Sequence, residues 1–405
     1  MGLVCKPQIE VEDIVLEMDE NNETGVRDIT NTWGSIMPVV KIADRILSPG
    51  ELRGFDLSVK INQIPQFTMS INDSSLLVRK SLKEDVDKCV IFIGFKDWYI
   101  KFNGIIRNTF SSAGDSMLTI SGELYNELLF SLVEQYAYKE MSVTDILTDI
   151  CNKTKMGLYV IENESLDSQP ELIINPNKRP LNFFDWCIKN LTNNLWCIDP
   201  LYHFHVGDID KLREKCNNNE LDKFTLDNLG QQGEETDIIF TSNPYIQNDD
   251  GGEKDKQIRI DYYTINSNYT DMFVSNPSQF FVNDEEHEVS SNPERGLGKV
   301  FTNRFWGSGG EENPGFLNNN VPFYRERVNK LIGGNIIEIT LKNLLFEISP
   351  FDVVRFDCYL PRQGNEALSL DEEHSGNKIV IGYSYSFDLN GDVEFPQIHQ
   401  KIELI

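Results

Sequence analysis

Residues Phe55–Ile61 read Phe-Asp-Leu-Ser-Val-Lys-Ile, and residues Phe67–Ile71 read Phe-Thr-Met-Ser-Ile. In both stretches apolar and polar side chains alternate, which is the pattern of a β-strand with one face buried and the other in water. Further strand-like stretches follow at 38–42, 90–95, 98–106 and 116–121. Strands at such regular spacing are typical of a small barrel or sandwich, so the sequence predicts an antiparallel β-barrel domain over residues 36–122.

Helical patterns appear over residues 123–210. Ser142 stands three residues before Asp145, which is the signature of a capped helix start, and the apolar residues behind it recur on one helix face. A second helix is predicted to begin near Asn182. The apolar stretches 195–198 and 202–206, separated by Asp199-Pro200, predict a hairpin. We therefore expect an α/β module inserted at 123–210.

The C-terminal residues 333–405 alternate again and predict a second β-barrel domain, with a hairpin turn at Asn390-Gly391. Residues 211–332 are rich in Asn, Gly and Asp and predict a loop-rich connecting domain, with a strand at 257–265 and a helix at 323–332. Residues 1–35 are acidic and irregular and are interpreted as an N-terminal extension. The predicted fold class is mainly β with an inserted α/β module and two similar small antiparallel β-barrels.

The two predicted barrels share a local plan. Gly104 lies in a long strand that precedes a turn at Gly114-Asp115, and Gly382 lies in a long strand that precedes Gly391-Asp392. In both places an alternating strand follows the turn. If the barrels are duplicates, three chains would present six similar β surfaces.

Composition excludes several classes of protein. The chain has 405 residues, 40% of them apolar and 11% aromatic, with a formal net charge of −27. No apolar run approaches the ~20 residues of a membrane-spanning helix, and the aromatic content is too high for a disordered chain. The acidic balance argues against a nucleic-acid reader of the basic-patch type. The N-terminus has no secretory pattern, and the seven cysteines lack C-x-x-C spacing, so we expect reduced thiols from assembly in a cytosol.

Three groups of residues are candidate sites. His203 and His205 lie on one strand face, but Asp208 is the only third ligand near them in the sequence, and a zinc site needs more. The stretch Asp388–Asp392 resembles a calcium loop but lacks its downstream Glu. Trp186 and Trp196 fit core packing better than a ligand platform. Because no hydrolase or phosphate-binding motif is present either, we predict no catalytic, cofactor or metal site.

The order of elements resembles that of the central baseplate hub proteins of contractile-tailed phages, which are related to the amino-terminal part of the type VI secretion spike protein VgrG and to the phage late control protein D group. The resemblance covers residues 36–405. The stretches that carry it are Ile64-Pro65, Phe102–Ile106, Ser142–Ile150, Leu195–Asp208 and Pro350–Val354. Many hubs have Pro-Gly-Asp at the last of these, and this chain has Phe351 in place of the Gly.

The resemblance implies a structural protein of the virion tail and not an enzyme. Such hubs form a homotrimeric ring, assembled in the host cytoplasm, that joins a hexameric tail tube protein to a trimeric central spike protein and contacts other baseplate proteins. DNA passes through the lumen without specific binding. The sequence is also compatible with two alternatives: another tail-tip structural protein of a virion or secretion system, and a β-rich carbohydrate hydrolase.

Overall fold

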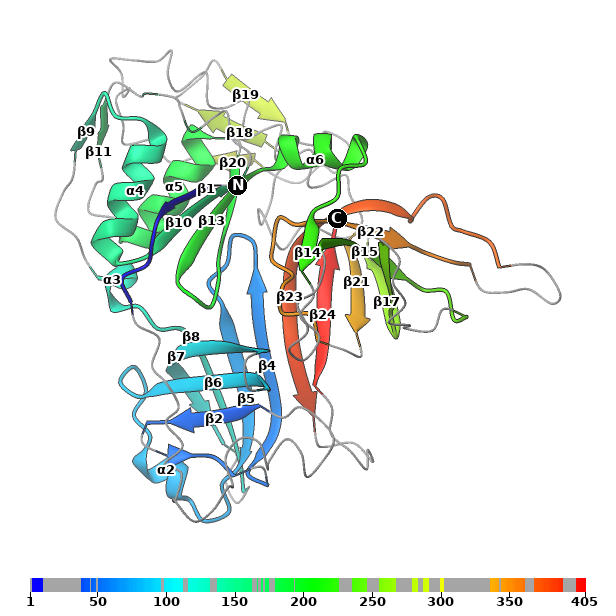
Figure 1. Cartoon of the computed structure of the whole chain (residues 1–405). Helices are drawn as coiled ribbons and strands as arrows, with labels where there is room; N and C mark the ends of the chain where they lie inside the picture. Colours follow the sequence, from blue (N-terminus) through cyan, green and yellow to red (C-terminus); the bar gives the residue numbers. More distant parts are fainter. Residues whose placement is uncertain are drawn as a thin grey trace.

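The structure is a computed structural model (Figure 1), and it is mainly β. None of the helices in the described ranges has the length and apolar composition needed to cross a membrane. The described residues are 2–9, 38–43, 45–48, 50–95, 98–111, 116–131, 137–161, 166, 169, 172–174, 179–192, 194–225, 235–245, 255–266, 279–282, 287–290, 299–301, 336–341, 344–360, 368–388 and 398–405.

The first β region curls around a core of alternating inward residues, and a short helix α2 (Leu77–Ser81) lies at its end (Figure 1). The predicted alternation is confirmed, because Phe55, Leu57 and Val59 are all buried. Its strands pair antiparallel in the order β4-β5-β8-β7-β6-β2-β3. They are β2 (Val39–Ile42), β3 (Arg45–Ile46), β4 (Leu52–Lys60), β5 (Gln66–Asn72), β6 (Lys88–Phe95), β7 (Trp98–Phe110) and β8 (Met117–Leu124).

The predicted α/β character of the next segment is confirmed by a sheet of order β1-β10-β13-β12, beside which helices α4 and α5 lie (Figure 1). Strands β10 and β13 are parallel, and the chain between them passes through α5. The first strand of this sheet comes from the start of the chain. The elements are β1 (Gly2–Cys5), α3 (Glu127–Phe130), β9 (Ala137–Lys139), α4 (Val143–Thr154), β10 (Gly157–Ile161), β11 (Leu172–Ile174), α5 (Pro180–Leu191), β12 (Asn194–Ile198), β13 (His203–Asp208) and α6 (Ile209–Asn217).

The second β region draws its strands from both sides of the long loop-rich stretch. They are β14 (Lys223–Thr225), β15 (Glu235–Thr241), β16 (Asp255–Arg259), β17 (Tyr262–Asn266), β21 (Ile336–Leu341), β22 (Val353–Asp357), β23 (Gly376–Asp388) and β24 (His399–Leu404). A separate small sheet contains β18 (Gln279–Val282), β19 (His287–Ser290) and β20 (Lys299–Phe301).

Five strands of the two β regions follow the same order. In the first region β4-β5-β8-β7-β6 are neighbours, and in the second β17-β21-β24-β23-β22 are neighbours, all antiparallel. Each series is also in the same chain order, from β4 to β8 and from β17 to β24. The next strand outward differs, because β2 pairs antiparallel with β6 whereas β15 pairs parallel with β22. The shared order indicates that the regions are two copies of one strand plan.

Residue by residue, the pairing registers of the two copies agree. Both long strands carry an irregularity at one position, between Ile106 and Asn108 in β7 and between Val380 and Gly382 in β23. Aligning these positions brings buried residues onto buried residues along the neighbouring strands. The matched pairs are Phe67 with Ile337, Met69 with Ile339, Ile71 with Leu341, Cys89 with Val354, and Ile91 with Phe356.

This alignment corrects one detail of the predicted local plan. Gly382 corresponds to Asn108 and not to Gly104, because the register irregularity fixes the match. Gly104 has its own packing reason, since a Cβ there would lie 2.4 Å from Cε1 of Phe67. The two Gly-Asp turns, at 114–115 and 391–392, lie outside the described residues.

The two β regions are joined directly. Strand β23 pairs with β4 over seven residues, from Gly382 opposite Lys60 to Asp388 opposite Gly54. A second apolar cluster ties the α/β module to the second β region: Ile61, Ile161, Leu195, Cys197, Ile209, Leu212, Phe351, Val353, Ile379 and Ile381. The module is therefore held against both β regions by buried apolar side chains.

Several sequence predictions of single elements need correction. Helix α5 begins at Pro180 and not near Asn182, because proline at the first helical position already has the helical φ and needs no amide donor. The predicted strand 257–265 is two strands, since the chain leaves β15 after Ile260 and then pairs with β21. Helix α6 and strand β15 were not predicted. The helix predicted at 323–332 and the turn at Asn390-Gly391 lie outside the described residues.

Candidate functional site

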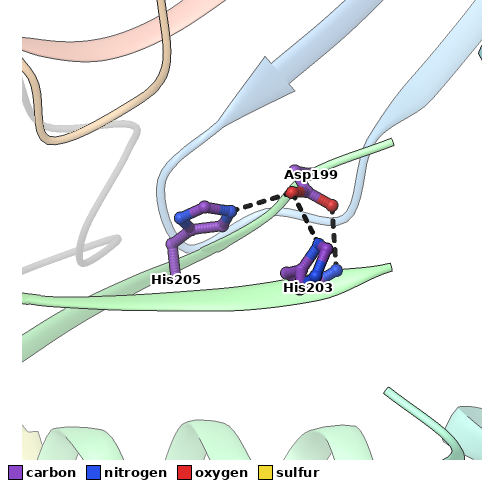
Figure 2. Close-up of side chains that lie close together, drawn as sticks. All are labelled: Asp199, His203 and His205. Carbon is purple, nitrogen blue, oxygen red and sulfur yellow. Dashed lines mark hydrogen bonds and ion pairs between the residues drawn. The ribbon is translucent and has the colours of Figure 1, made fainter. Parts of the chain in front are cut away.

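One cluster of chemically active side chains lies at the turn of the β12–β13 hairpin (Figure 2). Asp199 follows β12 directly, and His203 and His205 lie on β13. Because strand side chains alternate, both histidines point to the same face, as the sequence predicted. Nδ1 of His203 donates to Oδ2 of Asp199 over 3.0 Å, and Nε2 of His205 donates to the same oxygen over 2.9 Å.

The carboxylate of Asp199 is held in place from its other side. Its Oδ1 accepts the backbone N–H groups of Leu201 and His203, each at 2.8 Å. Burial of this carboxyl opposes its ionisation, but the hydrogen bonds from His203 and His205 outweigh burial and hold the pKa of Asp199 well below its usual range. Asp199 is therefore an anion with a fixed orientation.

The two imidazoles are confined by the neighbouring strand β10. The ring of Tyr159 stacks on His205 with 5.3 Å between centroids and meets His203 edge-on at 5.5 Å. Beside them, Gly157 has no side chain, and a Cβ there would lie 2.5 Å from Cδ2 of His203. The side chains of Asp199, His203 and His205 are between 14% and 18% exposed, so water reaches the cluster.

The third residue beside the two histidines is not the one that the sequence predicted. Asp208 does not join the histidines, because its carboxylate caps helix α6 and accepts the N–H groups of Asp210 and Lys211 at 2.9 and 3.4 Å. Asp199 takes its place, since its N–H donates to the carbonyl of His203 across the hairpin. Counting the hairpin register outward from the Asp199-Pro200 turn would have identified it from the sequence.

The other residues weighed as sites do not converge with this cluster. Trp196 is buried, and its indole N–H donates to Oδ1 of Asp185 over 2.8 Å, while Trp186 stacks on Phe183. Both tryptophans pack as the sequence predicted. Asp388 ends strand β23, and the rest of the calcium-like stretch lies outside the described residues.

No protein-family model and no curated protein matches the sequence. Among solved structures, the chain is similar to the 43 kDa tail protein of prophage MuSo2 from Shewanella oneidensis, with a TM-score of 0.52 and 12% identity over 92% of this chain and 97% of that one. It is also similar to a tail protein from Neisseria meningitidis, with a TM-score of 0.52 and 12% identity over 91% and 96% of the two chains. A component of the Escherichia coli type VI secretion system matches at a TM-score of 0.44 and 10% identity, over 90% of this chain and 76% of that one.

The comparisons confirm the predicted resemblance at the level of the fold. Nearly the whole of this chain and nearly the whole of each of the first two tail proteins superpose in one arrangement. The chain therefore has the fold of a phage tail protein.

Proposed function

We propose that the chain is a structural protein of a phage tail and, within the tail, the central hub of the baseplate. The observation that carries the proposal is the duplicated strand order of the two β regions. A chain with two similar sheets offers two similar surfaces, so three copies in a ring offer six. Such a ring has the symmetry needed to join a hexameric tail tube to a trimeric spike.

The junction inside one chain supplies a pattern for the junction between chains. Strand β23 of the second region pairs with β4 of the first. In the shared strand order, β7 corresponds to β23, and β17 corresponds to β4. Among the described strands, β17 pairs only with β21. If β7 of one copy meets β17 of the next as β23 meets β4, the ring closes and the open edge of β17 gains a partner strand. The same register places Phe110 opposite Asn266 of the neighbouring copy.

Two exposed aromatic side chains lie at this proposed junction. Phe110, at the end of β7, is 70% exposed, and Tyr262, at the start of β17, is 63% exposed. Large aromatic side chains are frequent anchors of protein interfaces. Their positions at the ends of these two strands support an interface there.

The charge of the chain suits a channel for DNA. Contacts between phosphate and Lys or Arg are the main source of non-specific affinity for DNA, and this chain has 64 acidic against 37 basic residues. An acidic channel wall would repel the duplex over about 8–10 Å and leave it free to slide. In this proposal the protein acts by shape and repulsion, without catalysis, in the tail of a virion assembled in the host cytoplasm.

Native mass spectrometry of the purified chain, alone and with its tube and spike proteins, tests the proposal. We expect trimers, or a complex of three copies with one trimeric spike, and a reconstruction of the particle should show an open central channel. A chain that remains monomeric with both partners, or that forms a ring of six, contradicts the hub and favours another position at the tail tip.

A further inference from the structure

The Asp199, His203 and His205 cluster is the one group in the described part of the chain where three metal-ligating side chains converge. Their ligand atoms all lie within 4.8 Å of one another. Two imidazole nitrogens and one carboxylate oxygen face a common point (Figure 2). The proposed tail function does not use this cluster.

The spacing of these atoms suits a metal ion. Zn²⁺ binds imidazole nitrogen and carboxylate oxygen at about 2.0–2.2 Å in a tetrahedral arrangement, so two of its ligand atoms lie about 3.4 Å apart. Oδ2 of Asp199 lies 3.0 Å from Nδ1 of His203 and 2.9 Å from Nε2 of His205. An ion would therefore need only small side-chain rotations, with each imidazole carrying its proton on the other ring nitrogen.

We propose that Asp199, His203 and His205 form a binding site for one divalent transition metal ion of the Zn²⁺ class. Two imidazoles select against Mg²⁺ and Ca²⁺, which prefer all-oxygen sites. The partial exposure of the three side chains leaves room for water to complete the coordination. The sequence predicted no metal here because it offered only Asp208 as a third ligand, and Asp199 supplies what was missing.

The cluster is built to keep its shape. Two backbone N–H groups orient Asp199, the ring of Tyr159 packs against both imidazoles, and Gly157 leaves room for the imidazole of His203. Ligands held in this way before the ion arrives lose little freedom on binding it. The ion would link the turn after β12 to the start of β13 and act as a structural staple of the hairpin.

The experiment uses the full chain after treatment with a chelator. Titration with Co²⁺, followed by visible absorption, and titration with Zn²⁺, followed by calorimetry, should each reach one equivalent per chain. The seven free cysteines are possible competing ligands, so the Co²⁺ spectrum should also lack a thiolate-to-metal charge-transfer band.

Two variants test the assignment of the ligands. Asp199→Asn keeps an oxygen for the N–H groups of Leu201 and His203 but loses the charge, and His205→Gln removes one imidazole. Each should lower the affinity for Zn²⁺ by more than about tenfold, with far-ultraviolet circular dichroism showing that the fold is kept. His374→Gln is the matched control, because His374 also contacts a single carboxylate, that of Asp371 at 2.8 Å, without a second histidine.

Three results would overturn the proposal. They are the absence of Co²⁺ and Zn²⁺ binding at millimolar concentration, a thiolate spectrum, and equal affinity in the wild type, Asp199→Asn and His205→Gln. Each would leave the cluster as a hydrogen-bonded lock of the turn.

Discussion

Phe351 occupies a backbone conformation that favours glycine, with φ at +80°, and its side chain is nevertheless buried. The ring packs against Gly207 of β13, where a Cβ would lie 2.9 Å from Cδ1 of Phe351. The strained backbone at Phe351 therefore brings an aromatic ring into the joint between the module and the second β region, and Gly207 leaves the space that this ring fills.

Because of this contact, we expect the effects of substitutions at Gly207 and Phe351 on the free energy of unfolding to depend on each other. Gly207→Ala should lower the free energy of unfolding by about 1–3 kcal/mol, because the new Cβ displaces the ring. In a Phe351→Ala background the same Gly207→Ala should cost less, since the clashing ring atoms are gone. Urea unfolding of the four proteins measures the coupling, and Gly54→Ala is the control, because its Cβ would meet no atom closer than 3.7 Å. Equal costs in both backgrounds would show that the ring and Gly207 do not interact.

Asp352, the next residue, predicts a pH dependence of stability. Burial raises the pKa of its carboxyl to about 8, against the hydrogen bond that it accepts from the N–H of Ser349 at 2.7 Å. The pKa of Asp352 in the folded state is above that in the unfolded state. The protonated carboxyl therefore contributes its full stabilisation of the fold below about pH 4, and this contribution is lost as the pH rises to about 8. Asp222 and Lys215 are the charged groups close enough to act on it.

Asp352→Asn should remove this dependence. The free energy of unfolding of the wild type should fall by on the order of 3 kcal/mol between pH 5 and pH 8 from this group, whereas the variant should lose less over that range. Urea titrations at intervals of one pH unit measure both slopes. If the slopes of wild type and variant coincide, Asp352 ionises in the folded protein much as it does in the unfolded chain.

At the candidate site, one relation was predicted from the sequence and the other was missed. The shared face of His203 and His205 follows from the two-residue period of a strand alone. The contact with Asp199 depends on which residues face each other across the turn, and that register was not worked out from the sequence. The capping role of Asp208 depended in turn on helix α6, which the sequence analysis did not predict.

At the scale of the elements, helix α4 shows where local signals suffice. Ser142 accepts the N–H of Asp145 over 3.1 Å and donates to Oδ2 of Asp145 over 2.7 Å, as the predicted capped start requires. Ser142→Ala should lower the free energy of unfolding by about 1 kcal/mol, because an N–H at the helix start loses its acceptor. Thermal unfolding measures the loss, and Ser142→Thr should restore most of it, because its hydroxyl can make both hydrogen bonds. A fully stable Ser142→Ala would mean that water caps the helix equally well.

Strands were predictable where one face is buried along their whole length, as in β4, β5 and β21, whose alternation survives in the structure. The division of the stretch 257–265 into β16 and β17 was not predictable, because both halves alternate and the break arises from their different partner strands. A strand's pattern records which face is buried and says little about which strand lies beside it.

In the molecule as a whole, the contacts that decide the architecture join residues that lie far apart in the sequence. The pairing of β23 with β4 joins residues 382–388 to residues 54–60, and no local pattern encodes it. Two similar barrels were predicted from a plan of a long strand with a glycine, a Gly-Asp turn and an alternating strand. The structure supports the shared strand plan through five matched strands, but Gly104 and Gly382 occupy different positions in it, and the two Gly-Asp turns lie outside the described residues.

A disulfide between copies would report on the proposed junction. If β7 of one chain pairs with β17 of the next in the register of β23 and β4, Phe110 and Asn266 of different chains lie directly opposite, with their Cα atoms about 4.5–5.5 Å apart. That separation is within the range of a disulfide. Mixing Phe110→Cys and Asn266→Cys proteins under mild oxidation should therefore give a cross-linked dimer on a non-reducing gel.

Either single variant alone, which carries the same native cysteines, should stay monomeric on that gel. The double variant should instead form covalent trimers, because each chain then has both halves of the junction. Phe110→Asp should weaken the trimer in native mass spectrometry, whereas Leu77→Asp, at a side chain 59% exposed on helix α2, should not. A trimer that persists without the Phe110–Asn266 cross-link would show that the copies meet through other strands, and that the internal β23–β4 junction is not repeated between chains.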